Sequence, residues 1–196
     1  MKDTFSLLSN KMILLLFLGI FFIVGVDVAT NYISSKLMAI RFGWTEAQVK
    51  FAPQVYFLCR TIGALLGAFM LAKVDEIKYF KVNIVACGVS LLLLIFIVSD
   101  VMDLVLIGAV GFFASSVFPI IYSVALKKRP DKANQISGLL ITAIAGGGIV
   151  TPAIGFSIAN IGITAGVFIV FLCVAYLTYC AFTINCLFYT SPSPRD

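Results

Sequence analysis

Two ionisable residues stand out because they lie inside apolar runs long enough to cross a membrane. Asp27 follows a run of leucine, isoleucine, phenylalanine and valine residues, and Arg60 lies near the middle of the next apolar run. An ionised side chain at the bilayer centre costs about 2.5–3.5 kcal/mol on the insertion scale, which makes each a candidate functional group. The second run is the less apolar, so Arg60 needs a partner. Since both residues lie at similar depth on consecutive antiparallel runs, we expect them to pair or to share a polar cavity.

Other polar side chains lie near these two residues in the sequence. Asn31 lies one helical turn beyond Asp27 on the same face, Tyr56 lies one turn before Arg60, and Gln54 is two residues from Tyr56. Amide, phenol and guanidinium groups provide the donors and acceptors that a polyhydroxylated ligand needs. The predicted substrate-binding residues are Asp27, Asn31, Gln54, Tyr56 and Arg60. The alternative is a structural role, in which an ion pair and interhelical hydrogen bonds only hold the helices together.

The composition predicts an all-α membrane protein. Hydrophobic residues make up 61% of the 196 residues and charged residues 12%, against about 45–50% and 25% in soluble domains. A bilayer needs about 20 apolar residues per helix. Six such runs form a predicted transmembrane bundle over residues 13–188, at about 13–35, 49–72, 81–98, 101–126, 136–159 and 162–188. Residues 1–12 are interpreted as a cytoplasmic linker and residues 189–196 as a non-native or disordered tail, as expected of a fragment.

The distribution of basic residues predicts the orientation. Six spans place both termini on one side of the membrane. That side carries nine basic residues: Lys2, Lys11, Lys73, Lys78, Lys81, Lys127, Lys128, Arg129 and Lys132. The opposite side carries three, Lys36, Arg41 and Lys50. The positive-inside rule therefore predicts a plasma (inner) membrane protein with both termini in the cytoplasm.

Glycine and proline residues predict weak points in the later helices. Pro119 lies in the fourth span, and the fifth contains Gly146, Gly147, Gly148 and Pro152. Both residue types weaken the backbone hydrogen-bond ladder, and interrupted helices are typical of the moving elements of transporters. We predict that these five residues are conformational hinges. Kinks in a static bundle are the alternative.

Several functions are disfavoured by what the sequence contains. The net charge of +5 comes from short clusters between apolar runs and not from a basic face, so no nucleic-acid partner is expected. The five cysteines lie in apolar runs and the chain has no histidine, so neither a metal site nor a cofactor is predicted. A membrane hydrolase would need a nucleophile beside a base. Ser115 and Ser116 have no evident base, so an enzyme is not expected.

Three segments resemble one family of carriers. Residues 24–31 (VGVDVATN) and 54–67 (QVYFLCRTIGALLG) are similar to the seventh and eighth helices of the fucose and glucose/galactose permease family of the major facilitator superfamily. Residues 136–155, with the three consecutive glycines and Pro152, are similar to its eleventh helix, and the basic loop 127–132 falls where that family has a cytoplasmic connection. The resemblance covers residues 11–188.

The resemblance implies the C-terminal six-helix half of a twelve-helix sugar carrier. It implies proton-coupled sugar uptake by alternating access, with a sugar, protons, the lipid bilayer and the missing N-terminal half as partners. The loop 73–81 keeps Asp75 but lacks the arginine-rich motif common in such carriers, so its gating role is in doubt. A carrier for another small solute and a non-transporting membrane scaffold are the alternatives. We expect that the chain does not transport alone.

Overall fold

The computed structural model describes residues 7–128 and 130–189, with side chains described as far as residue 184. Every regular element in these ranges is helical. The long helices are α2 (Lys11–Phe42), α3 (Phe51–Leu71), α4 (Glu76–Phe96), α5 (Asp100–Ala114), α6 (Val117–Lys128), α7 (Ala133–Thr142), α8 (Gly146–Asn160) and α9 (Ile163–Tyr189). Short 3₁₀ turns are η1 (Leu7–Ser9), η2 (Pro130–Lys132) and η3 (Ala143–Ala145).

The described helices form six spans that are long and apolar enough to cross a membrane. Helices α2, α3, α4 and α9 are each one span, α5 continues into α6, and η2, α7, η3 and α8 make up the fifth span. The predicted all-α membrane fold with six transmembrane helices is therefore confirmed. The expected tail falls on residues 189–196, of which 190–196 lie outside the described residues.

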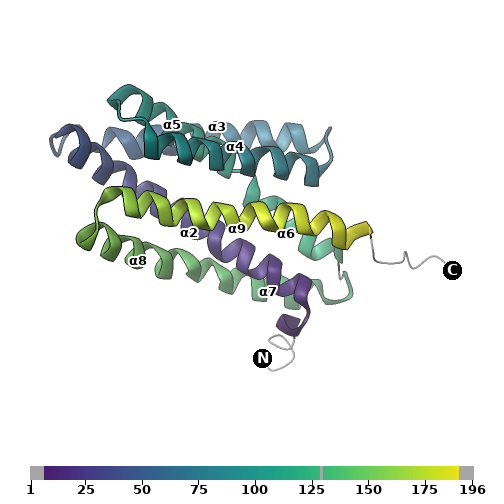
Figure 1. Cartoon of the computed structure of the whole chain (residues 1–196). Coiled ribbons are helices and arrows are strands. Elements are labelled where there is room, and N and C mark those ends of the chain that lie inside the picture. Colours follow the sequence, from purple (N-terminus) through teal and green to yellow (C-terminus); the bar gives the residue numbers. More distant parts are fainter. Residues whose placement is uncertain (1–6, 129, 190–196) are drawn as a thin grey trace.

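Helix α2 lies at the centre of the bundle. It packs against α9, α8, α6 and α3, whereas α3 packs mainly against α5 and α4 packs against α9 and α5 (Figure 1). Its buried residues include Ile33, Leu37 and Met38. These keep the helix packed well beyond residue 35, where the first predicted span ends. The helix ends at Gly43, whose φ of 65° is a left-handed terminating conformation that glycine adopts without steric cost.

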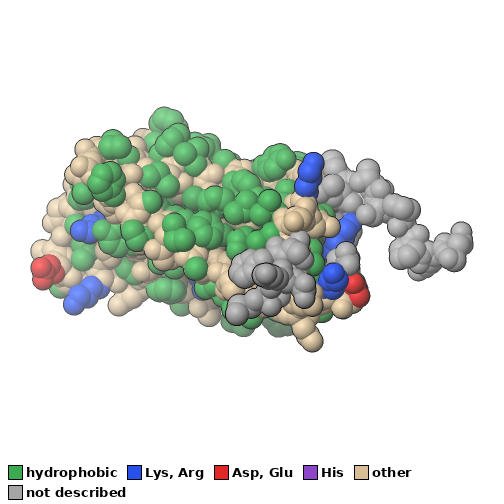
Figure 2. All heavy atoms as spheres, turned by 90° about the horizontal axis from the view of Figure 1, so that it is seen from below, with side chains coloured by type: hydrophobic (Ala, Val, Ile, Leu, Met, Phe, Trp, Pro, Cys, Tyr) green, Lys and Arg blue, Asp and Glu red, His purple; other side chains and the backbone are tan. Residues whose placement is uncertain are grey.

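The surface of the bundle is apolar around its middle. Figure 2 shows hydrophobic side chains over the central part of one face and charged side chains at its two ends. At the end that holds both termini, Lys127 binds Glu76 at 2.9 Å, which ties the end of α6 to the start of α4. Such a surface suits a lipid bilayer, where charges are tolerated only near the interfaces.

Glycines allow α3 and α5 to approach closely. A Cβ atom on Gly63 would overlap the backbone carbonyl oxygen of Phe112, and one on Gly67 would overlap Oγ of Ser116. From the other side, a Cβ on Gly111 would lie 2.7 Å from the carbonyl oxygen of Tyr56. Gly63 and Gly67 therefore form a close-packing pair on α3.

The predicted hinge residues lie at or near two interruptions. Helix α5 ends at Ala114 and α6 begins at Val117, so Pro119 is in the first turn of α6, where its missing N–H costs little. The 3₁₀ turn η3 comes directly before Gly146, and Pro152 lies inside α8. A moving role for these residues remains a prediction. The glycines differ in surroundings, since Gly146 and Gly147 pack against α2 and Gly148 has open space beside it.

Gly146 and Gly148 offer a matched test of packing. A Cβ on Gly146 would overlap backbone atoms of Phe21, which cannot move aside as a side-chain tip could. We expect Gly146→Ala to lower the free energy of unfolding by about 1–3 kcal/mol through overpacking. Gly148→Ala should be neutral or stabilise by up to about 1 kcal/mol. Thermal unfolding in detergent checks both variants, and equal unfolding temperatures would contradict the close contact between α2 and α8.

Candidate functional site

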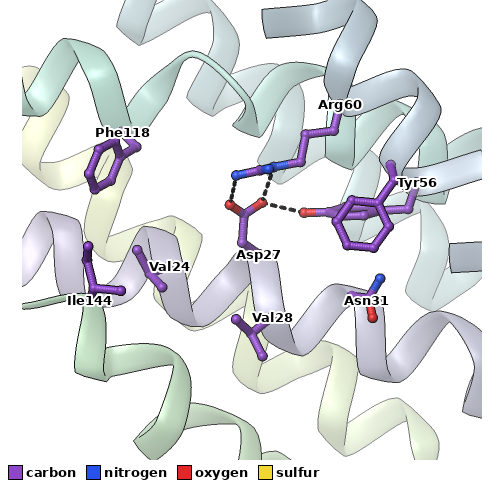
Figure 3. Close-up of a pocket in the computed structure, with 9 residues that line it drawn as sticks. Val24, Asp27, Val28, Asn31, Tyr56, Arg60, Phe118 and Ile144 are labelled. Atoms are coloured by element: carbon purple, nitrogen blue, oxygen red, sulfur yellow. Dashed lines mark hydrogen bonds and ion pairs between the residues drawn. The ribbon is translucent and has the colours of Figure 1, made fainter. Parts of the chain in front are cut away.

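Asp27 is the centre of a hydrogen-bonded cluster between α2 and α3. Its Oδ1 atom accepts a hydrogen bond from the Tyr56 hydroxyl at 2.6 Å and another from Nε of Arg60 at 2.9 Å. Its Oδ2 atom accepts from Nη2 of Arg60, so the guanidinium binds the carboxylate through two nitrogens (Figure 3). The predicted pairing of Asp27 and Arg60 is confirmed.

The local backbone explains why these groups meet. Tyr56 and Arg60 are four residues apart on α3, so they project from one face toward Asp27 on α2. Tyr56 is fully buried, and its ring lies 3.0 Å from the position a Cβ on Gly111 would take. A larger residue at position 111 would push α3 away from α5. The close glycine contact thus helps to fix the tyrosine, which in turn orients the carboxylate.

The cluster opens into a cavity of about 410 Å³. The lining residues come from α2, α3, α6 and η3: Val24, Asp27, Val28, Asn31, Tyr56, Phe57, Arg60, Phe118 and Ile144. In Figure 3, Phe118, Ile144 and Val24 lie on one side of the ion pair, whereas Tyr56 and Asn31 lie on the other. The cavity therefore has an apolar part beside a hydrogen-bonding part, as expected of a site for a neutral polar solute.

Asn31 has unused hydrogen-bonding capacity in this cavity. Its Nδ2 atom is buried and has no hydrogen-bond partner among the described residues. A buried unpaired donor costs about 1–3 kcal/mol, and a bound hydroxyl would recover part of this cost. Nη1 of Arg60 likewise has no hydrogen bond within the described part of the chain, and the Arg60 side chain is 38% exposed.

The structure places Gln54 away from the other four predicted residues. Gln54 is exposed and does not line the cavity. Two residues correspond to about 200° around a helix, so Gln54 points away from Tyr56 although the two are close in sequence. A role for Gln54 in substrate binding stays a prediction that this cavity does not support.

The apolar part of the cavity was not predicted from the sequence. Phe118 lies just after the break between α5 and α6, and Ile144 lies in η3. In sequence, both are ordinary apolar residues in apolar runs. Their place in the cavity depends on how two interrupted spans pack against α2, so no local signal could have selected them.

A second, more deeply buried ion pair was also missed. Nη1 of Arg41, at the end of α2, lies 2.9 Å from Oδ2 of Asp103 in the first turn of α5. The same nitrogen donates to the carbonyl oxygens of Leu94 at 2.8 Å and Ile97 at 3.3 Å, where α4 ends. The pair lies outside the cavity lining and joins the ends of three helices.

Comparisons with known proteins identify relatives of this chain. No protein-family model matches the sequence. A Helicobacter pylori protein provisionally named a glucose/galactose transporter is 30% identical over 155 residues, which are 76% of this chain and 37% of the relative. The glucose/galactose transporter of Brucella abortus is 29% identical over 170 residues, which are 83% of this chain and 40% of the relative.

Solved structures supply the fold. The crystal structure of the major facilitator superfamily transporter FucP in the outward conformation superposes with a TM-score of 0.85 and 22% identity. The superposed region covers 94% of this chain and 45% of the FucP chain. A structure of the E. coli fucose:proton symporter FucP gives a TM-score of 0.86. This likeness shows that the chain has the fold of about half of that transporter.

The chain spans less than half the length of the relatives it matches. It is a multi-pass membrane protein related to glucose/galactose transporters, with the fold of about half of a facilitator. Each relative named above is itself named a transporter or a symporter.

Proposed function

We propose that this chain is the C-terminal six-helix half of a carrier that takes up a sugar together with protons by alternating access. The cavity around Asp27 forms this half's wall of the substrate site, and the missing N-terminal half supplies the opposite wall. The proposed location is the plasma (inner) membrane with both termini in the cytoplasm, in line with the excess of lysine and arginine at that end.

One observation carries this proposal: the charged cluster borders a cavity and is not sealed between helices. The side chain of Asp27 is 17% exposed and that of Arg60 is 38% exposed, and both line the 410 Å³ cavity. A purely structural pair would be expected to lie in a dry contact, as Arg41 and Asp103 do with exposures of 9% and 0%. Charges that meet an accessible cavity inside a membrane favour a ligand-binding role.

The same geometry supports a sugar as the solute. Asn31 and Arg60 present N–H donors, Asp27 presents a carboxylate, and Phe118 presents an aromatic ring. A sugar carries hydroxyl groups for the first three and an apolar C–H face for the ring. The names of the glucose/galactose transporters and of the fucose:proton symporter support the same class of substrate and the coupling to protons.

Movement is proposed at the two interrupted spans. The break before Pro119 and the 3₁₀ turn before Gly146 replace regular helix near cavity-lining residues Phe118 and Ile144. Fewer regular backbone hydrogen bonds make these segments easier to bend. Helix α8 would move together with this bend, because it contains Gly147, Gly148 and Pro152.

The proposal is tested by uptake in proteoliposomes that contain the complete carrier. Radiolabelled glucose, galactose and fucose are compared with an organic anion and a cationic drug, with and without an imposed proton gradient. We expect saturable sugar uptake that falls when the gradient is collapsed. Transport of another solute alone would favour the alternative carrier, and no transport of any solute would favour a scaffold.

Asn31 provides a residue-level test in the same assay. We expect Asn31→Leu to raise the apparent KM for the sugar about tenfold, since one hydrogen bond contributes about 1–1.5 kcal/mol. Asn160→Leu is the matched control, because Asn160 is exposed at the end of α8 and its side chain donates to the carbonyl oxygen of Phe156. Equal KM values for the Asn31→Leu and Asn160→Leu carriers would remove Asn31 from the site.

A further inference from the structure

A second cavity adjoins Arg60 on the side away from Tyr56. Its volume is about 340 Å³, and it is lined by Arg60, Thr61, Ala64, Leu65 and Ser115. Among the residues that line it, Arg60 also lines the first cavity. The two cavities therefore share one side chain.

The second cavity lies farther along the bundle toward the end that holds both termini. Ala64 lies one helical turn beyond Arg60 in the direction of Leu71, and Tyr56 lies one turn before it. Ser115 lies at the break between α5 and α6. The cluster of Asp27 and Arg60 thus separates two spaces that follow one another along α3.

The side chains of the second cavity are prepared to accept hydrogen bonds. The hydroxyl of Thr61 donates to the carbonyl oxygen of Phe57 at 2.9 Å, and the hydroxyl of Ser115 donates to that of Phe112 at 2.7 Å. Because each hydroxyl proton is already used, each oxygen keeps lone pairs for an incoming donor. Ser115 is only 9% exposed, so its oxygen is held in a largely buried position.

Arg60 adds a donor that is not used by the ion pair. Nε and Nη2 bind Asp27, whereas Nη1 has no hydrogen bond within the described residues. A solute hydroxyl can accept from a guanidinium N–H and donate to a serine or threonine oxygen. The cavity therefore offers a sugar both kinds of partner without disturbing the ion pair.

We propose that this cavity is a second sugar subsite, occupied as the solute passes from the Asp27 cavity toward the end of the bundle that holds the termini. This inference rests on the proposed function and extends it. Arg60 is the shared donor: a sugar that leaves the first cavity exchanges Asn31 for Thr61 and Ser115 while it remains bonded to the guanidinium. Such an exchange avoids an intermediate in which the hydroxyls have no partner.

Filling the second cavity tests the inference, because none of Thr61, Ala64 and Ser115 lines the first one. In the complete carrier, we expect Ala64→Trp to reduce the initial rate of sugar uptake at least about tenfold while the equilibrium Kd changes less than about twofold. Ala68→Trp is the matched control, since Ala68 is exposed on α3 and does not line either cavity. Equal uptake by the two variants, or a parallel loss of affinity and uptake in Ala64→Trp, would overturn the inference.

A second measurement avoids the insertion of a large residue during folding. The Ala64→Cys carrier is folded, reconstituted and then treated with a small methanethiosulfonate reagent. We expect modification to block uptake, and saturating glucose or galactose to slow the modification at least about threefold relative to the Ala68→Cys carrier. The carrier without added cysteines corrects for its native thiols.

The outcomes separate this inference from the proposed function. If the Ala64→Cys carrier binds and transports sugar but its modification is insensitive to sugar, the second subsite alone is overturned. An unmodified parent carrier that neither binds nor transports any sugar overturns the proposed function itself.

Discussion

Replacing Asp27 by asparagine in the complete carrier is expected to reduce sugar uptake by about 100-fold. The asparagine oxygen can still accept the hydrogen bond from Tyr56, but it lacks the charge that holds the Arg60 guanidinium through two nitrogens. Charge-assisted, two-nitrogen pairs are the stronger and more directional kind of hydrogen bond. Arg60 would then leave its present position, and both cavities that it lines would lose a fixed donor.

The measurement for this variant must separate binding from folding. Initial uptake rates, equilibrium sugar affinity and the thermal unfolding temperature are recorded together. Asp100→Asn is the matched control, because Asp100 is exposed at the start of α5 and its carboxylate bonds the N–H of Val101. We expect that control to transport normally.

Two results would contradict the role assigned to Asp27. Unchanged uptake with unchanged sugar affinity would show that the carboxylate has no part in the substrate site. A loss of uptake that only follows a loss of folded carrier, and that Arg60→Lys reproduces, would favour the structural alternative, in which the pair only holds α2 against α3.

The central cluster could be predicted from the sequence because charge in an apolar run is costly. That cost singled out Asp27 and Arg60, and the similar depth of the two residues on consecutive spans was enough to pair them. Helical periodicity then placed Asn31 and Tyr56 correctly in the cavity lining. Periodicity also explains why Gln54 does not line this cavity, since it is near Tyr56 in sequence but points in another direction around the helix.

The remaining part of the site depends on tertiary structure. Phe118 and Ile144 reach the cavity because the fourth and fifth spans are interrupted and pack against α2. Proline and glycine residues indicated that these spans were weakened, but they did not reveal which neighbouring apolar side chains would turn inward. Helix α2 also extends past the predicted end of the first span, because its apolar packing continues beyond Ser35 and Lys36.

The ion pair of Arg41 and Asp103 was not predicted, because charges near the ends of apolar runs are usually solvated. Arg41 was counted among the basic residues that indicate orientation, and Asp103 was not singled out. The structure instead buries both, with exposures of 9% and 0%. Removing Arg41 from the count leaves nine basic residues against two, so the expected orientation does not depend on it.

This second pair carries the largest stability effect that we expect. Arg41→Met would leave the buried Asp103 carboxylate and the carbonyl oxygens of Leu94 and Ile97 without their common donor. Breaking a buried pair by removing one partner typically lowers the free energy of unfolding by about 3–5 kcal/mol, because an uncompensated charge stays behind. Denaturant unfolding in detergent micelles measures this change. Lys127→Met is the control, since Lys127 is 61% exposed in its pair with Glu76. This substitution should lower the free energy of unfolding by at most about 1 kcal/mol.

The double variant Arg41→Met with Asp103→Leu decides what the pair does. The stability lost in Arg41→Met can be traced to the unpaired Asp103 carboxylate by removing that carboxylate as well. If it is the cause, the double variant should regain most of the stability, since hydrophobic replacements of buried pairs are often neutral. If the double variant stays as unstable as Arg41→Met, the carbonyl oxygens at the end of α4 are the groups that need Arg41, and its main role is to cap that helix. If the single variant Arg41→Met had the stability of the parent chain, both explanations would be contradicted. The three helix ends would then hold together without the guanidinium.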